Sequence, residues 1–240
     1  MRKALAIGLL AAAAAISACA QSRGESGGPT VERDYQIGPF ERIEVAGHYE
    51  VDVRTGSAAS VHATGPEKEL ERLVVEVKGD RLLIHARKNR GLNFGFSSSE
   101  PTRIAVTVPK LSGAAIAGSG GIRVDRVASE RFKGEIAGSG DLDVEAIEAG
   151  DVELSIAGSG NIRAAGKAKS ARFNIAGSGD IEAERLVSET AEVSIAGSGN
   201  VAANATATAD LTTMGSGDIA LSGGAKCSVS KHGSGEIHCS

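Results

Sequence analysis

The residues best suited to chemistry lie near the C-terminus: Cys227, His232, His238 and Cys239. Thiolates and imidazoles bind zinc, but this spacing matches no familiar zinc-finger pattern. The two cysteines flank the last Gly-Ser-Gly of the chain, and an even pair in an oxidising compartment is typical of a disulfide. We expect a disulfide between Cys227 and Cys239 first, buried free thiols second and a metal site third.

Carboxylates offer the other possible chemistry. Glycoside hydrolysis needs two carboxyl groups at a set separation, and Asp141 and Asp143 are the nearest pair. Asp143 also belongs to a column of alternating charge described below, which explains it without catalysis. The recurring Gly-Ser-Gly-Asp resembles calcium-binding repeats, but those need a nine-residue period. We therefore expect no catalytic, cofactor-binding or metal-binding residues, and no enzyme.

The N-terminus reads as an export signal. Arg2 and Lys3 precede an apolar run over residues 4–16, followed by small residues. The sequence Ser17-Ala18-Cys19 resembles a lipobox, which would leave Cys19 lipidated. An ordinary cleavage site at Ala18-Cys19-Ala20 is the alternative. We favour the lipid anchor, and with it the outer membrane over a periplasmic or secreted protein.

The second half of the chain is a repeat. Gly-Ser-Gly recurs at intervals of 20, 20, 19, 20, 18 and 18 residues. Apolar residues recur two and four positions to either side of it, which is the alternation of a β-strand. Such units bury their apolar faces only by stacking, so the pattern predicts a parallel β-helix, with the right-handed crossovers that parallel strands favour.

The glycines are expected to form the corners, because glycine accepts backbone angles that other residues avoid. The seven glycine pairs are Gly118 and Gly120, Gly138 and Gly140, Gly158 and Gly160, Gly177 and Gly179, Gly197 and Gly199, Gly215 and Gly217, and Gly233 and Gly235.

Outward positions supply an independent check on the stacking. Two columns alternate in sign from one repeat to the next. They read Arg123, Asp143, Arg163, Glu182 and Lys133, Glu153, Arg172, Glu192. Parallel stacking would place opposite charges about 5 Å apart.

Domain boundaries follow from these patterns. We expect a signal peptide over residues 1–18, a lipidated cysteine with a flexible tether over 19–33, and one domain over 34–240. Within it, 34–110 would hold irregular strands, with a helical turn or two at 66–73, and 111–240 the seven repeats. The long segment 88–101 contains Phe94 and Phe96, which could be exposed or could cap the stack; we favour the cap.

The chain resembles the head GIN domain family, which carries the label "putative auto-transporter adhesin". The resemblance rests on residues 40–56 (FERIEVAGHYEVDVRTG), 75–84 (VEVKGDRLLI), 104–111 (IAVTVPKL) and the IAGSG repeats. It implies a β-helical bacterial envelope domain, often on lipoproteins, and implies no reaction, ligand or catalytic residue.

Charge and composition narrow the partners. The net charge is −4, and removal of Arg2 and Lys3 makes it −6, which does not favour nucleic acid. We expect adhesion to, or binding of, an envelope protein or a glycan through a face of the solenoid. A structural, assembly or signalling-accessory role is the alternative, and a glycan-active enzyme is less favoured. The sequence does not determine the oligomeric state.

Overall fold

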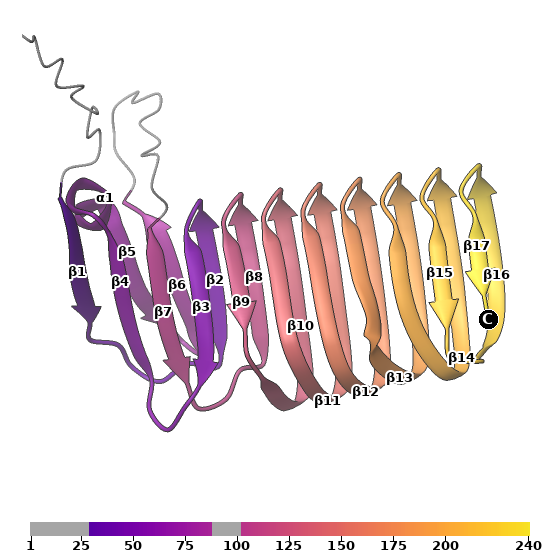
Figure 1. Cartoon of the computed structure of the whole chain (residues 1–240), viewed down its shortest axis with the longest axis horizontal. Coiled ribbons are helices and arrows are strands. Elements are labelled where there is room, and N and C mark those ends of the chain that lie inside the picture. The colour runs from indigo at the N-terminus through magenta and orange to yellow at the C-terminus, as the bar shows by residue number, and fades with distance from the viewer. Residues whose placement is uncertain (1–28, 88–101) are drawn as a thin grey trace, which may run out of the picture.

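The protein is described here by a computed structural model that places residues 29–87 and 102–240. Its strands stack into one elongated β-solenoid of about six turns (Figure 1). Each turn is called a rung below. This architecture confirms the parallel β-helix predicted from the repeats.

Parallel strands build the repeat region, and all its neighbouring strands pair in parallel. They are β8 (Gly113–Gly118), β9 (Gly121–Val124), β10 (Val127–Gly138), β11 (Asp141–Gly158), β12 (Asn161–Gly177), β13 (Asp180–Gly197), β14 (Val201–Gly215), β15 (Ile219–Ser222), β16 (Lys226–Gly233) and β17 (Ile237–Cys239). The long strands bend, so each contributes to two sheets. The strand segments that lead into the first corner glycine form one sheet, called sheet A. The segments that follow a corner form the facing sheet, called sheet B.

The predicted columns are in register. Ile136 pairs with Ile116 on one side and Ile156 on the other, and Ile156 pairs with Ile175. All four are at most 3% exposed. Phe132 and Phe173 are fully buried in neighbouring columns, so the core is one continuous apolar seam along the solenoid axis.

Glycine is required at the corner for two different reasons. Gly158, the first glycine of its triplet, has φ = +134°, which side chains with a Cβ rarely adopt. Gly160, the second, has no positive φ but lies against the backbone of Gly140, where a Cβ would overlap the Gly140 carbonyl oxygen. The corners therefore align along one edge, the upper edge in Figure 1.

The N-terminal segment extends the solenoid instead of forming the irregular strands we expected. Its elements are β1 (Thr30–Tyr35), β2 (Arg42–Gly47), β3 (Glu50–Thr55), β4 (Ser60–Pro66), α1 (Glu67–Arg72), β5 (Leu73–Lys78), β6 (Arg81–Ala86) and β7 (Arg103–Val108). β2 and β3 form a rung whose Gly47 pairs with Gly118. Gly47-His48-Tyr49 thus occupies the place of a Gly-Ser-Gly corner.

The rungs do not follow chain order at this end. β2 lies between β6 and β8, and β3 lies between β7 and β9 (Figure 1). The chain therefore builds the β2/β3 rung first, adds the β6/β7 rung outside it, and returns through residues 109–112 to continue with β8.

Antiparallel strands and the helix cap this end. β4 pairs with β7, β1 pairs with β4, and β5 pairs with β6. The predicted helix is present as α1, and its Leu70 is fully buried over the end of the core. Residues 30–33, which we assigned to the tether, instead belong to β1, because β4 offers them a free strand edge to pair with.

Candidate functional site

The outward side of sheet A carries a shallow groove with an alanine floor. Ala117, Ala137, Ala157, Ala176 and Ala196 immediately precede successive corners, and each pairs in register with the next. Ala115, Glu135, Ser155, Asn174 and Ser194 form the adjacent column. We call this surface the alanine groove; it encloses about 670 Å³ and runs across the strands from β2 and β6 to β13.

Strand alternation creates this floor. The isoleucine before each alanine points into the core, so the alanine must point outward. A methyl group covers little of the sheet, and the groove remains open where a larger side chain would fill it. Ala157 and its stacked neighbours are exposed, so the floor presents methyl groups, with hydroxyl and amide groups of Ser155, Asn174 and Ser194 beside them.

Ion pairs line the groove near its β2 end. Arg42 is 2.5 Å from Asp80, and Arg81 is 2.7 Å from Glu44. Further along, Lys133 lies 3.1 Å from Glu135 and 3.2 Å from Glu153. The hydrogen bond to Glu135, and then that to Glu153, raises the pKa of Lys133.

These charges are matched rather than concentrated. The hydrogen bond from Arg42 to Asp80 raises the pKa of Arg42 and lowers the pKa of Asp80. Exposed pairs of this kind contribute little stability. Each arginine at the β2 end of the rim is paired with a carboxylate and the alanine floor carries no charge, which suits an uncharged ligand better than an ionic one.

The predicted charge columns form ion pairs. Arg163 lies 2.9 Å from Glu182, and Arg172 lies 2.8 Å from Glu192. Together with the pair between Lys133 and Glu153, they confirm that residues about twenty apart are neighbours across the rungs.

The position after each corner forms a second ladder on sheet B. Asn161 donates its side-chain amide to Asp141 over 2.9 Å, and Asn200 donates likewise to Asp180. The backbone N–H of Asp218 donates to the Asn200 side chain over 3.1 Å. These side chains therefore bond the neighbouring rung.

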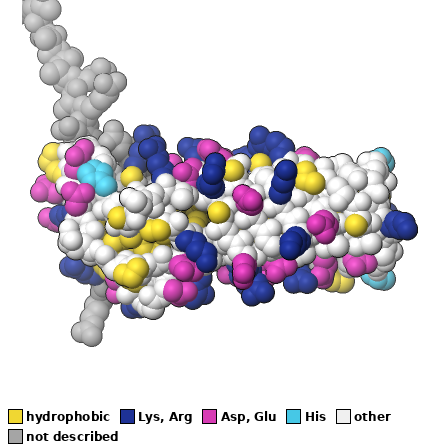
Figure 2. Space-filling view, turned by 90° about the horizontal axis from the view of Figure 1, so that it is seen from below, with side chains coloured by type: hydrophobic (Ala, Val, Ile, Leu, Met, Phe, Trp, Pro, Cys, Tyr) yellow, Lys and Arg dark blue, Asp and Glu magenta, His cyan; other side chains and the backbone are white. Residues whose placement is uncertain are grey.

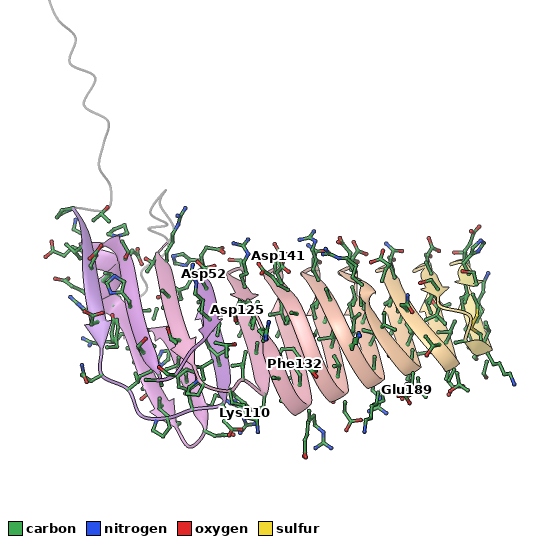
Figure 3. All side chains as sticks on the ribbon, turned by 60° about the horizontal axis from the view of Figure 1, so that its bottom comes forward. Asp52, Lys110, Asp125, Phe132, Asp141 and Glu189 are labelled. Carbon is green, nitrogen blue, oxygen red and sulfur yellow. A yellow bond between two sulfur atoms is a disulfide. The ribbon has the colours of Figure 1, made fainter. Side chains whose placement is uncertain are left out.

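Asp141 and Asp143 line a polar hollow of about 390 Å³ on sheet B, together with Glu50. Asp143 pairs in register with Arg123 and Arg163, as the charge column predicts. Burial, and then the nearby Asp141 and Asp52, raise the pKa of Glu50. Figure 3 labels Asp52 and Asp141 near the corner edge of the stack, and the buried Phe132 further from that edge.

Comparisons with known proteins decide the family. Residues 39–225 match the model of the family described as "putative auto-transporter adhesin, head GIN domain". The chain belongs to this family. A comparison with curated proteins finds no match.

Solved structures share the fold of this GIN domain. A putative adhesin from Bacteroides fragilis is 23% identical with a TM-score of 0.82, over 88% of this chain and 97% of that one. A putative lipid binding protein from Parabacteroides distasonis is 28% identical with a TM-score of 0.70, over 89% and 97%. A putative adhesin from Parabacteroides merdae is 17% identical with a TM-score of 0.67, again over 89% and 97%.

The C-terminal residues of the GIN domain do not gather into a metal site. Cys227 and Cys239 form a disulfide, the first of the three arrangements considered, with their Cα atoms 6.6 Å apart. His232 and His238 are exposed on the last rung. Within residues 29–87 and 102–240, no group of three or more His, Cys, Asp or Glu side chains is arranged to hold a metal ion.

Several predicted features lie outside the described residues: the signal peptide, Cys19, and the aromatic pair Phe94 and Phe96. Among the described residues, no helix is long and apolar enough to span a bilayer.

The sequence did not predict which residues lie at the β2 end of the groove, or that the stacked alanines form its floor. Arg42 and Arg81 belong to strands that we had not assigned to the stack. The stacked alanines were not identified as a surface feature. The signal was present in Val45-Ala46-Gly47, which resembles the Ile-Ala-Gly at the first five Gly-Ser-Gly corners.

Proposed function

We propose that this GIN domain is a non-catalytic binding protein of the cell envelope, and that it contacts its ligand through the alanine groove. The groove carries the proposal because it is a long, continuous surface whose alanine floor carries no charge. Its volume of about 670 Å³ is within the range of small-molecule pockets, about 300–1,000 Å³.

The chemistry of the groove favours an extended ligand that runs along the solenoid axis. Neighbouring strands lie about 4.8 Å apart, so the floor repeats methyl and polar groups at that interval. An extended chain crossing several rungs meets a methyl group at each step, with Ser155, Asn174 and Ser194 beside it on three successive rungs. Small side chains allow close approach, and rigid strands lose little conformational freedom when the ligand binds.

Adhesion agrees with the family to which the chain belongs. A surface that binds through many weak, repeated contacts gains strength when several copies engage one target, because the later contacts become intramolecular. A lipid anchor at Cys19 would present many copies on one membrane. The alternative function for the same surface is assembly, in which an envelope protein docks in the groove.

Lipid binding is a second candidate function. The protein from Parabacteroides distasonis, 28% identical, is described as a putative lipid binding protein. The methyl floor of the alanine groove would accept an acyl chain lying across the strands, with Ser155 and Ser194 beside it. This candidate differs from adhesion because it requires a single lipid molecule and no second surface.

A bulky charge in the groove tests the proposal. Ala157→Arg places a guanidinium at the centre of the floor, and Ala220→Arg places the same group on the exposed face of sheet B as a matched control. Beads coated with each variant are mixed with bacterial cells, and separately with fluorescent fatty acid. Loss of cell attachment with Ala157→Arg alone supports adhesion, and loss of fatty-acid binding alone supports the lipid candidate. Equal behaviour of the two variants in both assays contradicts the groove.

A further inference from the structure

The two ends of the solenoid are built differently. At the N-terminal end, α1 buries Leu70 over the core and antiparallel strands cover the outer rung. At the C-terminal end, and among the residues that the structure places, β16 pairs only with β14, and β17 pairs only with β15. Half of the backbone N–H and C=O groups along β16 therefore face away from the stack, and an exposed strand edge of this kind is a template for another strand.

The columns of buried core residues end at this edge. Leu211 is 1% exposed, whereas Val229, the next residue of its column, is 52% exposed because nothing stacks upon it. In the isoleucine column, Ile195 and Thr213 are buried, and Lys231 follows them and is exposed. The free edge thus presents an apolar side chain and, two residues later, a cation, both at positions that face the core in earlier rungs.

The charge of this edge is positive although the chain as a whole is acidic. Lys226 and Lys231 lie on β16, and neither has a carboxylate within salt-bridge distance among the described residues. Glu236 is the one carboxylate side chain between residues 223 and 240. Basic side chains and histidines gather at this end of the molecule, on the right in Figure 2.

These charges decide between two possible occupants. A second copy could pair with β16 about a two-fold axis through Val229, since serine flanks Val229 on both sides. That pairing would place Lys226 opposite His232 and Lys231 opposite Cys227 of the other copy, so neither lysine would meet a carboxylate of the paired strand. Lysine on a strand edge is a common device against such self-association.

We propose that β16 accepts an extended, acidic segment of a partner protein by β-strand addition. The backbone of the added strand completes the hydrogen bonds of the free edge. An apolar side chain of the partner covers Val229, and a carboxylate two residues away pairs with Lys231. In strand addition, backbone hydrogen bonds supply the affinity and alternate side chains supply the specificity. Val229 and Lys231 are the alternate side chains that would select the partner here.

A peptide taken from the repeat itself serves as the probe. Residues 190–197 (TAEVSIAG) stack in the column register of β16, so Val193 would cover Val229 and position 195 would meet Lys231. The test peptide carries Ile195→Glu, and the matched control carries Ile195→Lys; both have blocked termini. Binding is measured at low ionic strength by chemical-shift changes of the oxidised full-length protein, with Lys231→Glu and, as a control for net charge, Lys167→Glu.

The expected result is shift changes centred on residues 226–233 and a preference for the Glu peptide of up to about fivefold, the upper range of an exposed ion pair. Lys231→Glu should reverse the preference, and Lys167→Glu should leave it unchanged. Equal binding of both peptides, or shifts centred on the alanine groove, would overturn the proposal. Concentration-dependent dimers through β16 would overturn it in favour of a second copy. Because Ala157→Arg does not touch this edge, failure here leaves the proposed function standing, and the reverse also holds.

Discussion

The backbone N–H of Ser159 donates a hydrogen bond of 2.8 Å to the carbonyl oxygen of Gly138 in the preceding rung. The same bond recurs from Ser139 to Gly118, from Ser178 to Gly158 and at each later corner. Bond and backbone conformation depend on each other, because the glycine at the start of each corner has a positive φ that directs its carbonyl toward the next rung. The corners are therefore the places where the stack is least tolerant of substitution.

Gly158→Val tests that intolerance. Valine at φ = +134° is strained by about 1–3 kcal/mol, and its side chain would also overlap the backbone of Gly138. We expect a loss of at least about 2 kcal/mol in the free energy of unfolding, measured by urea denaturation. Gly38→Val is the control, since Gly38 has no positive φ and no heavy atom within 4 Å of an added Cβ. Equal stability of the two variants would show that the corner does not need glycine.

The fold was largely predictable because its signals are periodic. The spacing of Ile136, Ile156 and Ile175 alone predicts that they stack in one column. The opposite charges of Arg163 and Glu182 indicate the same register independently. The β6/β7 rung was not predictable, because it lies out of chain order and shares no corner motif with the repeats. Nothing local in a sequence states that a later strand will pack outside an earlier one.

The candidate site was predictable only in its parts. Alternation places Ala157 outward, but an outward alanine becomes the floor of a groove only when its neighbours in both directions are also small. That requires the exact stacking of five rungs. The rim residues Arg42 and Asp80 are distant in sequence and meet only because β2 and β6 are adjacent.

The first strand should respond to pH through His62. Its ring nitrogen Nδ1 lies 2.8 Å from Asp34 of β1, and that hydrogen bond raises the pKa of His62. A raised folded-state pKa means that the contribution is fully present below the unfolded value of about 6.5 and is lost as the pH rises through the folded value. We expect β1 amides to be less protected from exchange at pH 8 than at pH 6, relative to the intrinsic exchange rate at each pH.

An NMR titration measures this directly. Asp34→Asn should lower the pKa of His62 toward its ordinary value. It should also remove most of the pH dependence of the protection of β1 amides from exchange. The NMR signals of His85, half-buried on β6 beside Glu76, serve as the internal reference that this substitution should not move. A His62 pKa that is the same in both proteins would refute the contact.

The last rung should depend on its disulfide. Cys227 and Cys239 are 12 residues apart in sequence, and closing a loop of that size stabilises by roughly 2–3 kcal/mol. Under non-reducing conditions, an unfolded sample should show no alkylation of either cysteine by mass spectrometry. Reduction should speed hydrogen exchange in β16 and β17 while leaving β11 and β12 unchanged. Full alkylation without reductant would show that no bridge forms.

The predicted anchor rests on Cys19. Cys19→Ala should release the protein from membranes, because no acyl chain can then attach to the sulfur. Fractionation of cells and metabolic labelling with a fatty-acid analogue measure this together. Ser17→Ala is the control, since a small residue there keeps the cleavage motif. Lipid labelling that persists in Cys19→Ala would refute the assignment.

Photo-crosslinking from the alanine groove tests the proposed function most directly. A photoreactive amino acid replaces Ala157 on the groove floor or, in the matched control, Ala220 on sheet B, and intact cells are irradiated before mass spectrometry. The proposal predicts a defined adduct, enriched at Ala157 and competed by excess unmodified protein. Adducts that are equal from both positions, or absent from Ala157 while present at Ala220, would contradict it.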